Sequence, residues 1–438
     1  MFMKIPDEVK YIIETLQADG YAAYIVGGCV RDNILGKEPK DWDICTSALP
    51  EQISKSFKSH HIIETGLRHG TVTLMLEHKP FEITTFRIDG RYSDNRRPDG
   101  VKFVRDLKTD LSRRDFTVNA IAYSPNGGIV DFFGGINDLK KGVIRCVGDP
   151  AQRFREDALR ILRAFRFASV LSFSIDGDTA KAMLENRVRI KNIAAERVAN
   201  EINKMITGGK AGILMSEFFP IIAEIIPELI PTVGFGQERD YDLLSHILTG
   251  VDNAPKEVVI RLAVLFHDIA KPVCRAESNS AEHFCKHSQL SADIAKNILL
   301  RLKYDTAAIK QITELILYHD TNIPSDKKTV KRWLNKIGEC GFRQLIQVKI
   351  AVAITESGSR QPEALDSLKK ISALTDEIIE QQECFSLKDL AVSGEDFLAA
   401  GVKEGAEIGK LLNRLVDMVI NEELENDKNE LLKAVLPL

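Results

Sequence analysis

The sequence predicts an α+β protein, in which a head built on a mixed β-sheet is followed by an all-helical neck, body and tail. The first 145 residues combine runs of alternating polarity with helical runs, whereas almost everything after residue 150 repeats its apolar residues at helical spacing. A chain of 438 residues has room for about two to four domains. We expect four domains: the head at 1–145, the neck at 146–210, the body at 211–370 and the tail at 371–438.

Composition narrows the classes of protein that fit. The seven cysteines are dispersed without a CxxC pair, which argues against a zinc ribbon or a disulfide framework and predicts reduced thiols in the cytoplasm. No window approaches the roughly 18 apolar residues of a membrane span, so we expect no membrane partner. The net charge is −4, so a nucleic-acid partner requires a local basic patch.

Periodicity predicts the helices and strands of the head in chain order. Residues 7–18 are predicted to form a helix, "YAAYIVGG" a strand that ends in a turn, and "DWDICT" a second strand. "GTVTLMLE" (70–77) and "FEITTFR" (81–87) alternate in polarity, which predicts two strands joined by a short turn. Residues 88–114 lose this periodicity and gain arginine and lysine, as a loop or a nucleic-acid contact does.

Two carboxylates in this head indicate a metal site. Asp41 and Asp43 are two residues apart, and on a strand this spacing points both to one face. Oxygen-only ligands favour Mg²⁺, and two such ions can clamp an in-line phosphoryl displacement. Glu82, on the alternating strand, is the candidate third catalytic carboxylate. A bare DxD is more often a solvated strand end, and a lone Glu82 is as often a surface residue.

A glycine turn and an arginine precede the carboxylate pair. Gly27 and Gly28 allow backbone N–H groups to approach phosphate oxygens, and Arg31 adds a charged donor. This combination at this spacing favours the metal and phosphate interpretation over a solvated strand end.

The order of several motifs carries a family resemblance. "GGCVRD" with "DWD" resembles the nucleotidyltransferase superfamily that includes poly(A) polymerase and CCA-adding tRNA nucleotidyltransferase. Four later motifs resemble, in order, those of bacterial class II CCA-adding enzymes: "RRDFTVNA" (113–120), "DFFGGINDLKKGVIR" (131–145), "EDALRILRAFRF" (156–167) and "AAERVANE" (194–201). The resemblance covers the first 210 residues and implies a nucleotidyltransferase-type head. It also implies addition of CCA to the tRNA 3′ end from CTP and ATP, with Mg²⁺ as cofactor.

One predicted helix, 153–168, contains a pair suited to base selection. Asp157 and Arg160 are three residues apart, so on a helix they are neighbours. Cytosine and adenine present an amino donor beside a ring-nitrogen acceptor, whereas uracil and guanine present a carbonyl beside an N–H. A carboxylate with a guanidinium therefore matches C and A and rejects U and G. An isolated Asp-x-x-Arg is usually only a surface ion pair.

The resemblance assigns further roles. The base-selecting residues of the family's EDxxR motif map onto Asp157 and Arg160, and its further arginines onto Arg163 and Arg166. Arg166 is an alternative ligand for the triphosphate or a structural residue of the neck. The resemblance also implies that Arg114 meets the incoming nucleotide and Asp115 its ribose. The loop 87–98 resembles the one that permits the switch from C to A addition, which argues against an enzyme that adds only C.

Five of the nine histidines lie between 246 and 319. His267 and Asp268 are adjacent in an apolar helix, and with His246 and His287 they form a candidate second divalent-metal site. The pattern resembles the HD phosphohydrolase superfamily, with His283 and His319 nearby. That superfamily has a final aspartate where this chain has Glu356. The alternative interpretation is a helical domain whose histidines only pack.

The predicted tail is rich in glycine and carries modest positive charge. Residues 386–423 space four glycines between amphipathic segments, which resembles the C-terminal region of bacterial CCA-adding enzymes and implies tRNA contact; ordinary turns are the alternative. Modest positive charge there comes from Lys388, Lys403, Lys410 and Arg414.

Other activities are also consistent with the sequence: addition of the terminal A alone, poly(A) polymerisation, HD phosphohydrolysis of tRNA ends, or a non-catalytic RNA-binding scaffold.

Overall fold

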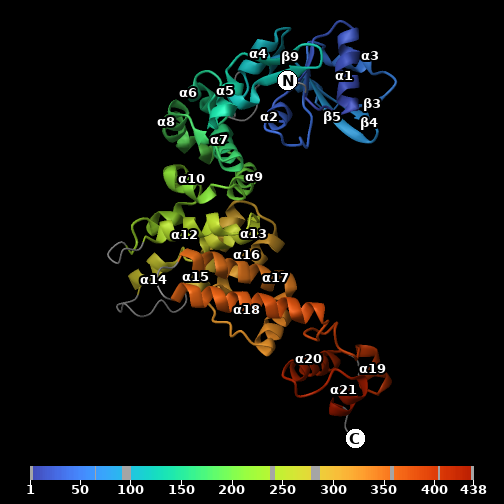
Figure 1. Cartoon of the computed structure of the whole chain (residues 1–438), viewed down its shortest axis with the longest axis vertical. Helices are drawn as coiled ribbons and strands as arrows, with labels where there is room; N and C mark the ends of the chain where they lie inside the picture. The colour runs from blue at the N-terminus through green and yellow to red at the C-terminus, as the bar shows by residue number, and fades with distance from the viewer. Residues whose placement is uncertain are drawn as a thin grey trace. The chain divides into compact units, whose positions relative to one another are not determined.

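The computed structural model describes residues 3–64, 66–90, 100–236, 242–277, 287–355, 360–402 and 405–435. The chain divides into two compact units, Met1–Pro227 and Glu228–Leu438 (Figure 1). The seven-stranded sheet lies in the first unit, and after β11 every secondary-structure element in the described residues is a helix. The predicted α+β class, with a mixed sheet followed by helices, is confirmed.

The head is built on this sheet, whose strand order is β3-β4-β5-β2-β1-β8-β9. Its strands are β1 (Ala23–Val26), β2 (Ile44–Thr46), β3 (His61–Ile63), β4 (Thr71–Leu76), β5 (Lys79–Thr85), β8 (Ile121–Ser124) and β9 (Gly128–Asp131). The β2–β5 pair is parallel and the other pairs are antiparallel, so the sheet is mixed. This one parallel pair matters for the site.

Helices beside the sheet follow the predicted periodicity. Helix α1 (Asp7–Ala18) has the predicted bounds and buries Val9, Ile12, Ile13 and Leu16, which recur at three- and four-residue spacing on one face. The other head helices are α2 (Gly28–Ile34), α3 (Pro50–Ser56), α4 (Leu107–Ser112) and α5 (Gly135–Lys141).

Two local expectations for the head were wrong. "DWDICT" becomes a strand only at Ile44, so Asp41 and Asp43 precede β2 rather than lying within it. The segment 88–114 is not one long loop. Strands β6 (Arg87–Asp89) and β7 (Val101–Phe103) pair antiparallel, and α4 follows them. Within the loop predicted at 87–98, residues 91–98 lie outside the described residues.

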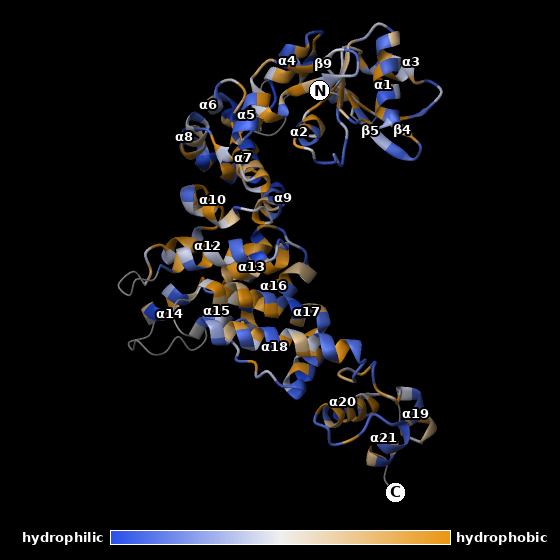
Figure 2. Ribbon diagram, in the orientation of Figure 1, coloured by the Kyte–Doolittle hydropathy of each residue, from blue (hydrophilic) through white to orange (hydrophobic). Residues whose placement is uncertain are grey.

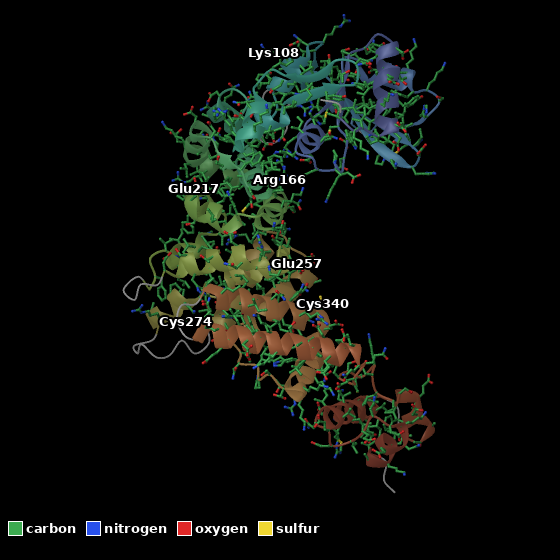
Figure 3. The ribbon with its side chains drawn as sticks, in the orientation of Figure 1. Lys108, Arg166, Glu217, Glu257, Cys274 and Cys340 are labelled. Carbon is green, nitrogen blue, oxygen red and sulfur yellow. The ribbon has the colours of Figure 1, made fainter. Side chains whose placement is uncertain are left out.

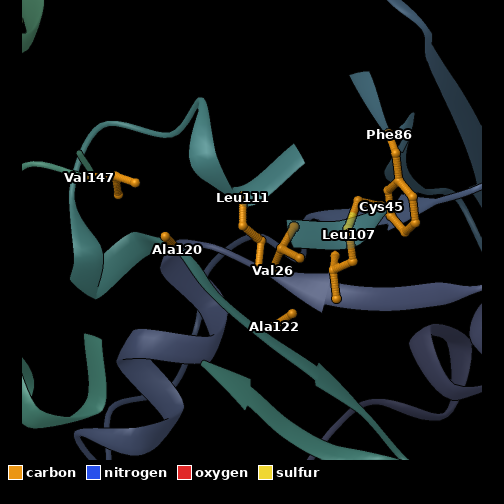
Figure 4. Close-up of a cluster of buried hydrophobic side chains, with 8 residues drawn as sticks. All are labelled: Val26, Cys45, Phe86, Leu107, Leu111, Ala120, Ala122 and Val147. Carbon is orange, nitrogen blue, oxygen red and sulfur yellow. The ribbon is translucent and has the colours of Figure 1, made fainter. Parts of the chain in front are cut away.

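A cluster of buried apolar side chains, which includes Cys45 of β2, forms part of the core of the head. Figure 4 shows its members, which come from β1, β2, α4, β8 and from residues outside regular helices and strands: Val26, Cys45, Phe86, Leu107, Leu111, Ala120, Ala122 and Val147. Val26 precedes the glycine turn and pairs with Ala122 across the β1–β8 ladder. The cluster therefore fixes the end of β1 from which the turn and α2 project.

The neck is helical and is broken where the sequence predicted a continuous helix. The helices of the first unit that follow the head are α6 (Pro150–Glu156), α7 (Leu159–Leu171), α8 (Gly177–Asn186), α9 (Ala195–Ile206), α10 (Ala211–Glu217) and α11 (Phe219–Ile225), of which the last two lie beyond the predicted neck. The chain also forms two short parallel strands, β10 (Val143–Ile144) and β11 (Ser174–Ile175). Asp157 lies between α6 and α7 with φ −140° and ψ 105°. Its Oδ1 accepts a 3.0 Å hydrogen bond from the Leu159 N–H, a local bond that competes with helix.

The second unit is a helical body and a smaller helical tail. The body contains α12 (Leu243–Asn253), α13 (Val258–Phe266), α14 (Lys271–Glu277), α15 (His287–Arg301), α16 (Thr306–Tyr318), α17 (Lys327–Thr355) and α18 (Arg360–Glu380). The tail contains α19 (Gly394–Ala399), α20 (Ala406–Ile420) and α21 (Lys428–Val435). In Figure 2, α20 is largely coloured as hydrophobic, and its buried residues contribute to the tail's own core. Among the described helices, none has the length and apolarity to cross a membrane.

Candidate active site

A cationic cavity of about 450 Å³ is lined by both head and neck. Its charged lining consists of seven arginines and three aspartates: Arg31, Arg113, Arg114, Arg160, Arg163, Arg166, Arg197, Asp43, Asp115 and Asp157. The remaining lining residues include Gly27, Gly28, Asn119 and Phe167. We call this cavity the nucleotide cleft. Its excess of positive charge suits a polyphosphate ligand.

The glycine turn leaves no room for a side chain. Gly27 has φ +82°, and a Cβ there would lie 3.0 Å from Nη1 of Arg114 and 3.6 Å from Oδ2 of Asp43. The backbone therefore approaches both charged groups as only glycine permits. Gly28 begins α2, which presents Arg31 one turn later.

The three predicted carboxylates are brought to one place by the parallel strand pair. Ile44 of β2 pairs with Ile83 of β5, so the preceding residues, Asp43 and Glu82, are also neighbours. Phe81 and Ile83 are buried while Glu82 is exposed, as strand alternation requires. Asp41, Asp43 and Glu82 together line a second cavity of about 530 Å³.

The electrostatics of these acids fit a divalent cation. Desolvation in the crowded site raises the pKa of Asp43, Arg114 opposes the rise, and repulsion by Asp41 adds to it. A raised carboxyl pKa marks negative charge that the protein itself does not fully compensate. With three carboxylates as the donor set, the residues fit an oxygen-preferring metal such as Mg²⁺.

A chain of hydrogen bonds fixes two of the cleft arginines. Arg31 donates through Nη1 to Oδ1 of Asn119 (2.6 Å), and Nδ2 of Asn119 donates to Oδ1 of Asp115 (3.1 Å). Asp115 in turn accepts from Nε of Arg163 at 2.7 Å. This network connects α2 of the head with α7 of the neck. Asn119 belongs to the motif "RRDFTVNA", but nothing in the sequence marks it as the residue that links Arg31 to Asp115.

The same arginines surround one aromatic ring. The guanidinium carbons of Arg31, Arg163 and Arg166 lie 5.0, 5.4 and 4.3 Å from the centroid of the Phe167 ring. Arg166, labelled in Figure 3, also forms an ion pair of 3.2 Å with Glu201. Cation–π attraction holds the three charges together. The sequence did not indicate Phe167, because its apolar side chain looks like an ordinary core residue.

The relation predicted between Asp157 and Arg160 differs from the one observed. They do not lie one turn apart on a single helix, because the helix breaks at Asp157. Arg160 instead donates to Oε2 of Glu156 (2.9 Å) and to the carbonyl of Arg113 (3.1 Å). Asp157 and Arg160 nevertheless line the same cleft.

Arg113 and Arg114 are oriented by a buried acid. Asp110, in α4, lies 2.9 Å from Nη2 of Arg113 and 3.6 Å from Nη2 of Arg114. Arg113 and Arg197 line the cleft without having been predicted to do so. Both lie within the quoted motifs, so a motif-wide search for arginine would have found them.

The body brings its predicted histidines together around Asp268. The Nε2 atoms of four histidines lie near its carboxylate: His267 at 3.1 Å, His287 at 3.3 Å, His319 at 3.5 Å and His246 at 3.6 Å. His246 and His267 lie near Oδ2, whereas His287 and His319 lie near Oδ1. Two groups of possible metal ligands therefore share Asp268. His283, Glu356 and Lys403 lie outside the described residues.

Comparison with known proteins connects this geometry to a family. Three family models match: the poly A polymerase head domain over residues 23–145, the probable RNA and SrmB-binding site of polymerase A over 172–229, and a putative tRNA nucleotidyltransferase domain 2 over 277–435. The chain is 33% identical to a CCA-adding enzyme of Pediococcus pentosaceus, covering 98% of this chain and 97% of that protein.

Solved structures show the same likeness. The Bacillus stearothermophilus CCA-adding enzyme, crystallised in complex with CTP, is 28% identical with a TM-score of 0.67 and covers 99% of this chain and 98% of its own. The Thermotoga maritima CCA-adding enzyme, complexed with tRNA, shares the fold with a TM-score of 0.59 at 20% identity, covering 98% and 94% of the two chains.

Proposed function

This chain belongs to the family of CCA-adding enzymes, and on that premise we propose that it builds the CCA end of tRNA from CTP and ATP without a template. The observation that carries the proposal is the nucleotide cleft, in which the glycine turn, seven arginines and Asp157 line one cavity together with Asp43. A scaffold that only bound RNA would need neither the carboxylates nor the base-selecting pair.

We propose Mg²⁺ as the divalent metal that the family implies, held by Asp41 and Asp43 with Glu82 beside them. When bound, two such ions would neutralise the triphosphate and make the attacking hydroxyl more acidic, as in the two-metal arrangement common in nucleotidyl transfer. The pKa of Asp43, raised by desolvation and by Asp41, supports this site. The chain itself supplies the carboxylate cradle and the adjacent Arg114.

The triphosphate is held by backbone and guanidinium donors. The Gly27–Gly28 turn provides close backbone approach, and Arg31 and Arg114 provide charge. Arg163 and Arg166 extend the positive surface along the neck side of the cleft. The Asn119 network fixes Arg31 before the nucleotide arrives, which reduces the entropy lost on binding.

The base is selected by Asp157 and Arg160. Arg160 is oriented by three acceptors, the Glu156 carboxylate and the carbonyls of Arg113 and Arg153, and does not depend on a turn of helix shared with Asp157. The Asp157 carboxylate accepts a hydrogen bond from the amino group that C and A share. The Arg160 guanidinium donates a hydrogen bond to the adjacent ring nitrogen. Uracil and guanine would place a carbonyl against the carboxylate and an N–H against the guanidinium.

Product sizing tests the function directly. A tRNA lacking CCA is offered CTP alone, ATP alone, or both. We expect two added nucleotides with CTP, a third when ATP is also present, and no homopolymer. No addition of C to tRNA that lacks CCA, together with addition of A to tRNA that ends in CC, would instead establish an adenylyltransferase, and a long A tail would establish a poly(A) polymerase.

Two variants separate catalysis from specificity. Asp43→Asn should abolish addition, whereas Asp7→Asn, in the first turn of α1, should not change it. Arg160→Ala should raise the ratio of UTP to CTP incorporation more than it weakens tRNA binding. An unchanged ratio would contradict the proposed base selection.

The histidine cluster favours a second candidate activity, metal-dependent hydrolysis of a phosphoester at a tRNA end. Nδ1 of His267 and of His319 each lie 2.7 Å from a backbone carbonyl, which can only accept, so each Nδ1 carries the proton. Burial lowers the pKa of His246 to about 3, with repulsion from His267, and also lowers that of His319. The Nε2 lone pairs of His246 and His319 therefore face the Asp268 carboxylate, an arrangement that a divalent cation between them would stabilise.

We propose a divalent metal bound by His246, His267, Asp268 and His287, with His319 adjoining. Lys271, whose Nζ lies 2.5 Å from Oδ2 of Asp268, supplies positive charge at the same carboxylate. The test uses the full chain with Asp43→Asn, which removes nucleotidyl transfer. Mn²⁺-dependent cleavage of an RNA ending in a 2′,3′-cyclic phosphate should vanish with His267→Ala but persist with His61→Ala. Failure of Mn²⁺ to bind would leave only the packing interpretation.

A further inference from the structure

The helical body contains a cavity of about 540 Å³, which we call the body cavity. Its lining includes Asp268 and the four histidines around it, and it continues to helices α17 and α18. Sites for small molecules usually have volumes of about 300–1,000 Å³, and a metal ion alone needs only a small part of such a space. The metal site proposed above therefore accounts for only one part of the cavity.

One wall of the body cavity is mostly apolar. Helix α18 contributes four residues that recur at i, i+3, i+4 and i+7 and so share one helix face: Ala364, Ser367, Leu368 and Ile371. Helix α17 adds Val352 and Ala353. Ligand sites combine such apolar walls with a few polar groups, and an apolar wall accommodates a flat group such as a nucleobase.

Lys349 of α17 brings a positive charge to the same cavity. Its half-buried side chain lines the cavity, and Nζ donates to the backbone carbonyls of His319 (2.6 Å) and Thr321 (2.8 Å). An ammonium has three N–H donors, so one is left over. In the part of the chain that the structure describes, Lys349 has no further hydrogen bond and no carboxylate within 4.0 Å.

A second lysine of the lining lies at the metal end. Nζ of Lys271 is 2.5 Å from Oδ2 of Asp268, whereas Lys349 is bonded to the backbone of His319, whose Nε2 is 3.5 Å from Oδ1. The other carboxylate of the lining, Asp320, has a side chain that is 69% exposed, so solvent screens its charge. Lysine ammonium groups are common ligands of phosphate. The cavity therefore joins an apolar wall to two cations.

We propose that the body cavity binds one nucleoside phosphate, with the phosphate between Lys271 and Lys349 and the nucleoside against the α17–α18 wall. A free mononucleotide and the terminal nucleotide of an RNA present this same chemistry. The site deepens the second candidate activity and rests on it for the phosphoester. Lys349 contacts the substrate in this assignment, whereas a lysine with a purely structural role would only cap the end of α16.

Amine labelling followed by peptide mass spectrometry reports on each lysine separately. The full-length protein is kept in chelator, so that no metal-dependent cleavage occurs, and is treated briefly with acetic anhydride. Three probes are added in turn: adenosine 2′,3′-cyclic phosphate, adenosine, and a short single-stranded RNA that ends in a 2′,3′-cyclic phosphate. Lys296, exposed on α15, is the internal control.

At a concentration about tenfold above its Kd, the cyclic nucleotide should slow acetylation of Lys349 about 10-fold, because only about a tenth of the sites stay open. Lys296 should react as before. Adenosine at the same concentration should protect Lys349 much less, because it lacks the phosphate. Protection by the mononucleotide alone would support a free nucleotide as the ligand, and protection by the RNA alone would support an RNA end. Equal protection by adenosine, or protection by none of the probes, would overturn the assignment.

Calorimetric binding to two variants gives a second readout. Lys349→Met should weaken binding of the cyclic nucleotide in the body about 10-fold, and Lys296→Met should leave it unchanged. The nucleotide cleft is the same in both variants, so their difference reports on the body. A lower Tm with unchanged affinity would show that Lys349 only caps α16. If Lys349→Met fails to fold, the labelling of the unchanged protein decides alone.

The two hypotheses fail in different ways. Protection of Lys349 without any Mn²⁺-dependent cleavage would remove the second candidate activity and leave a nucleotide-binding site. Cleavage by the protein without protection of Lys349 by either phosphate probe would remove only the nucleoside phosphate site.

Discussion

Nε of Arg163 donates a 2.7 Å hydrogen bond to Oδ2 of Asp115, and this ion pair joins the head to neck helix α7 beside the nucleotide cleft. Asp115 is 7% exposed, so little water competes for the pair. Burial alone would raise the pKa of Asp115, but Arg163, Asn119 and the Phe116 N–H outweigh it and lower the pKa to about 2. The carboxylate is therefore ionised throughout the working range of pH.

Asp115→Asn should destabilise the protein in a pH-dependent way. The folded pKa is below the value of about 3.9 for a free aspartate, so the ionised group stabilises the fold above about pH 4. We expect a loss of about 1.5–3 kcal/mol at pH 7, shrinking as the pH falls toward 2. Calorimetric unfolding at several pH values measures it. Asp376→Asn, which breaks an exposed ion pair with Arg343, should cost far less at every pH.

Asn119→Ala should weaken nucleotide binding more than turnover. The change removes the 2.6 Å acceptor that holds Arg31 and a donor to Asp115. Losing about 1.4 kcal/mol of positioning corresponds to a roughly 10-fold higher KM for CTP and ATP. Steady-state kinetics on a CCA-lacking tRNA tests this, with Asn126→Ala, an exposed residue that donates to Gln17, as the control. A fall in kcat with unchanged KM would assign Asn119 a different role.

Gly27→Ala and Gly20→Ala form a matched pair. Both glycines have positive φ, +82° and +86°, so each substitution strains the backbone, and Gly27, with ψ −136°, lies in a region that residues with a side chain rarely enter. A Cβ at Gly20 meets nothing within 4 Å, whereas at Gly27 it lies 3.0 Å from the Arg114 guanidinium. Both variants should melt lower, Gly27→Ala by the larger amount, but only Gly27→Ala should reduce kcat/KM for CTP, by 10-fold or more. Equal activities would show that Arg114 moves aside freely.

The metal-free body should lose stability in mild acid because of His246. Burial, reinforced by His267, lowers the pKa of His246 to about 3, against about 6.5 for a free histidine. Between these values the unfolded chain takes up a proton that the folded chain excludes, so stability falls as the pH falls from 6.5 toward 3. In chelator, the Tm of His246→Gln should fall less steeply than that of the wild type over this range. The exposed His61→Gln should follow the wild type.

Several features of the fold and site were evident from the sequence, because they are local. The apolar spacing over residues 7–18 predicts α1 with its observed bounds, and alternation at 70–77 predicts β4. Motif order within the first 210 residues was enough to indicate the family. Such signals depend on neighbours along the chain, where periodicity and turn chemistry operate directly.

The sequence by itself thus determined the fold class, the family and the inventory of charged groups, while tertiary structure decided which groups meet. Glu82 lies beside Asp43 only because β2 and β5 pair in parallel in that register. Asp157 interrupts a helix that periodicity made continuous, because its side chain bonds the Leu159 N–H. Phe167 gathers three arginines from two elements. These contacts depend on strand register and packing between segments distant in the chain, which no local pattern encodes.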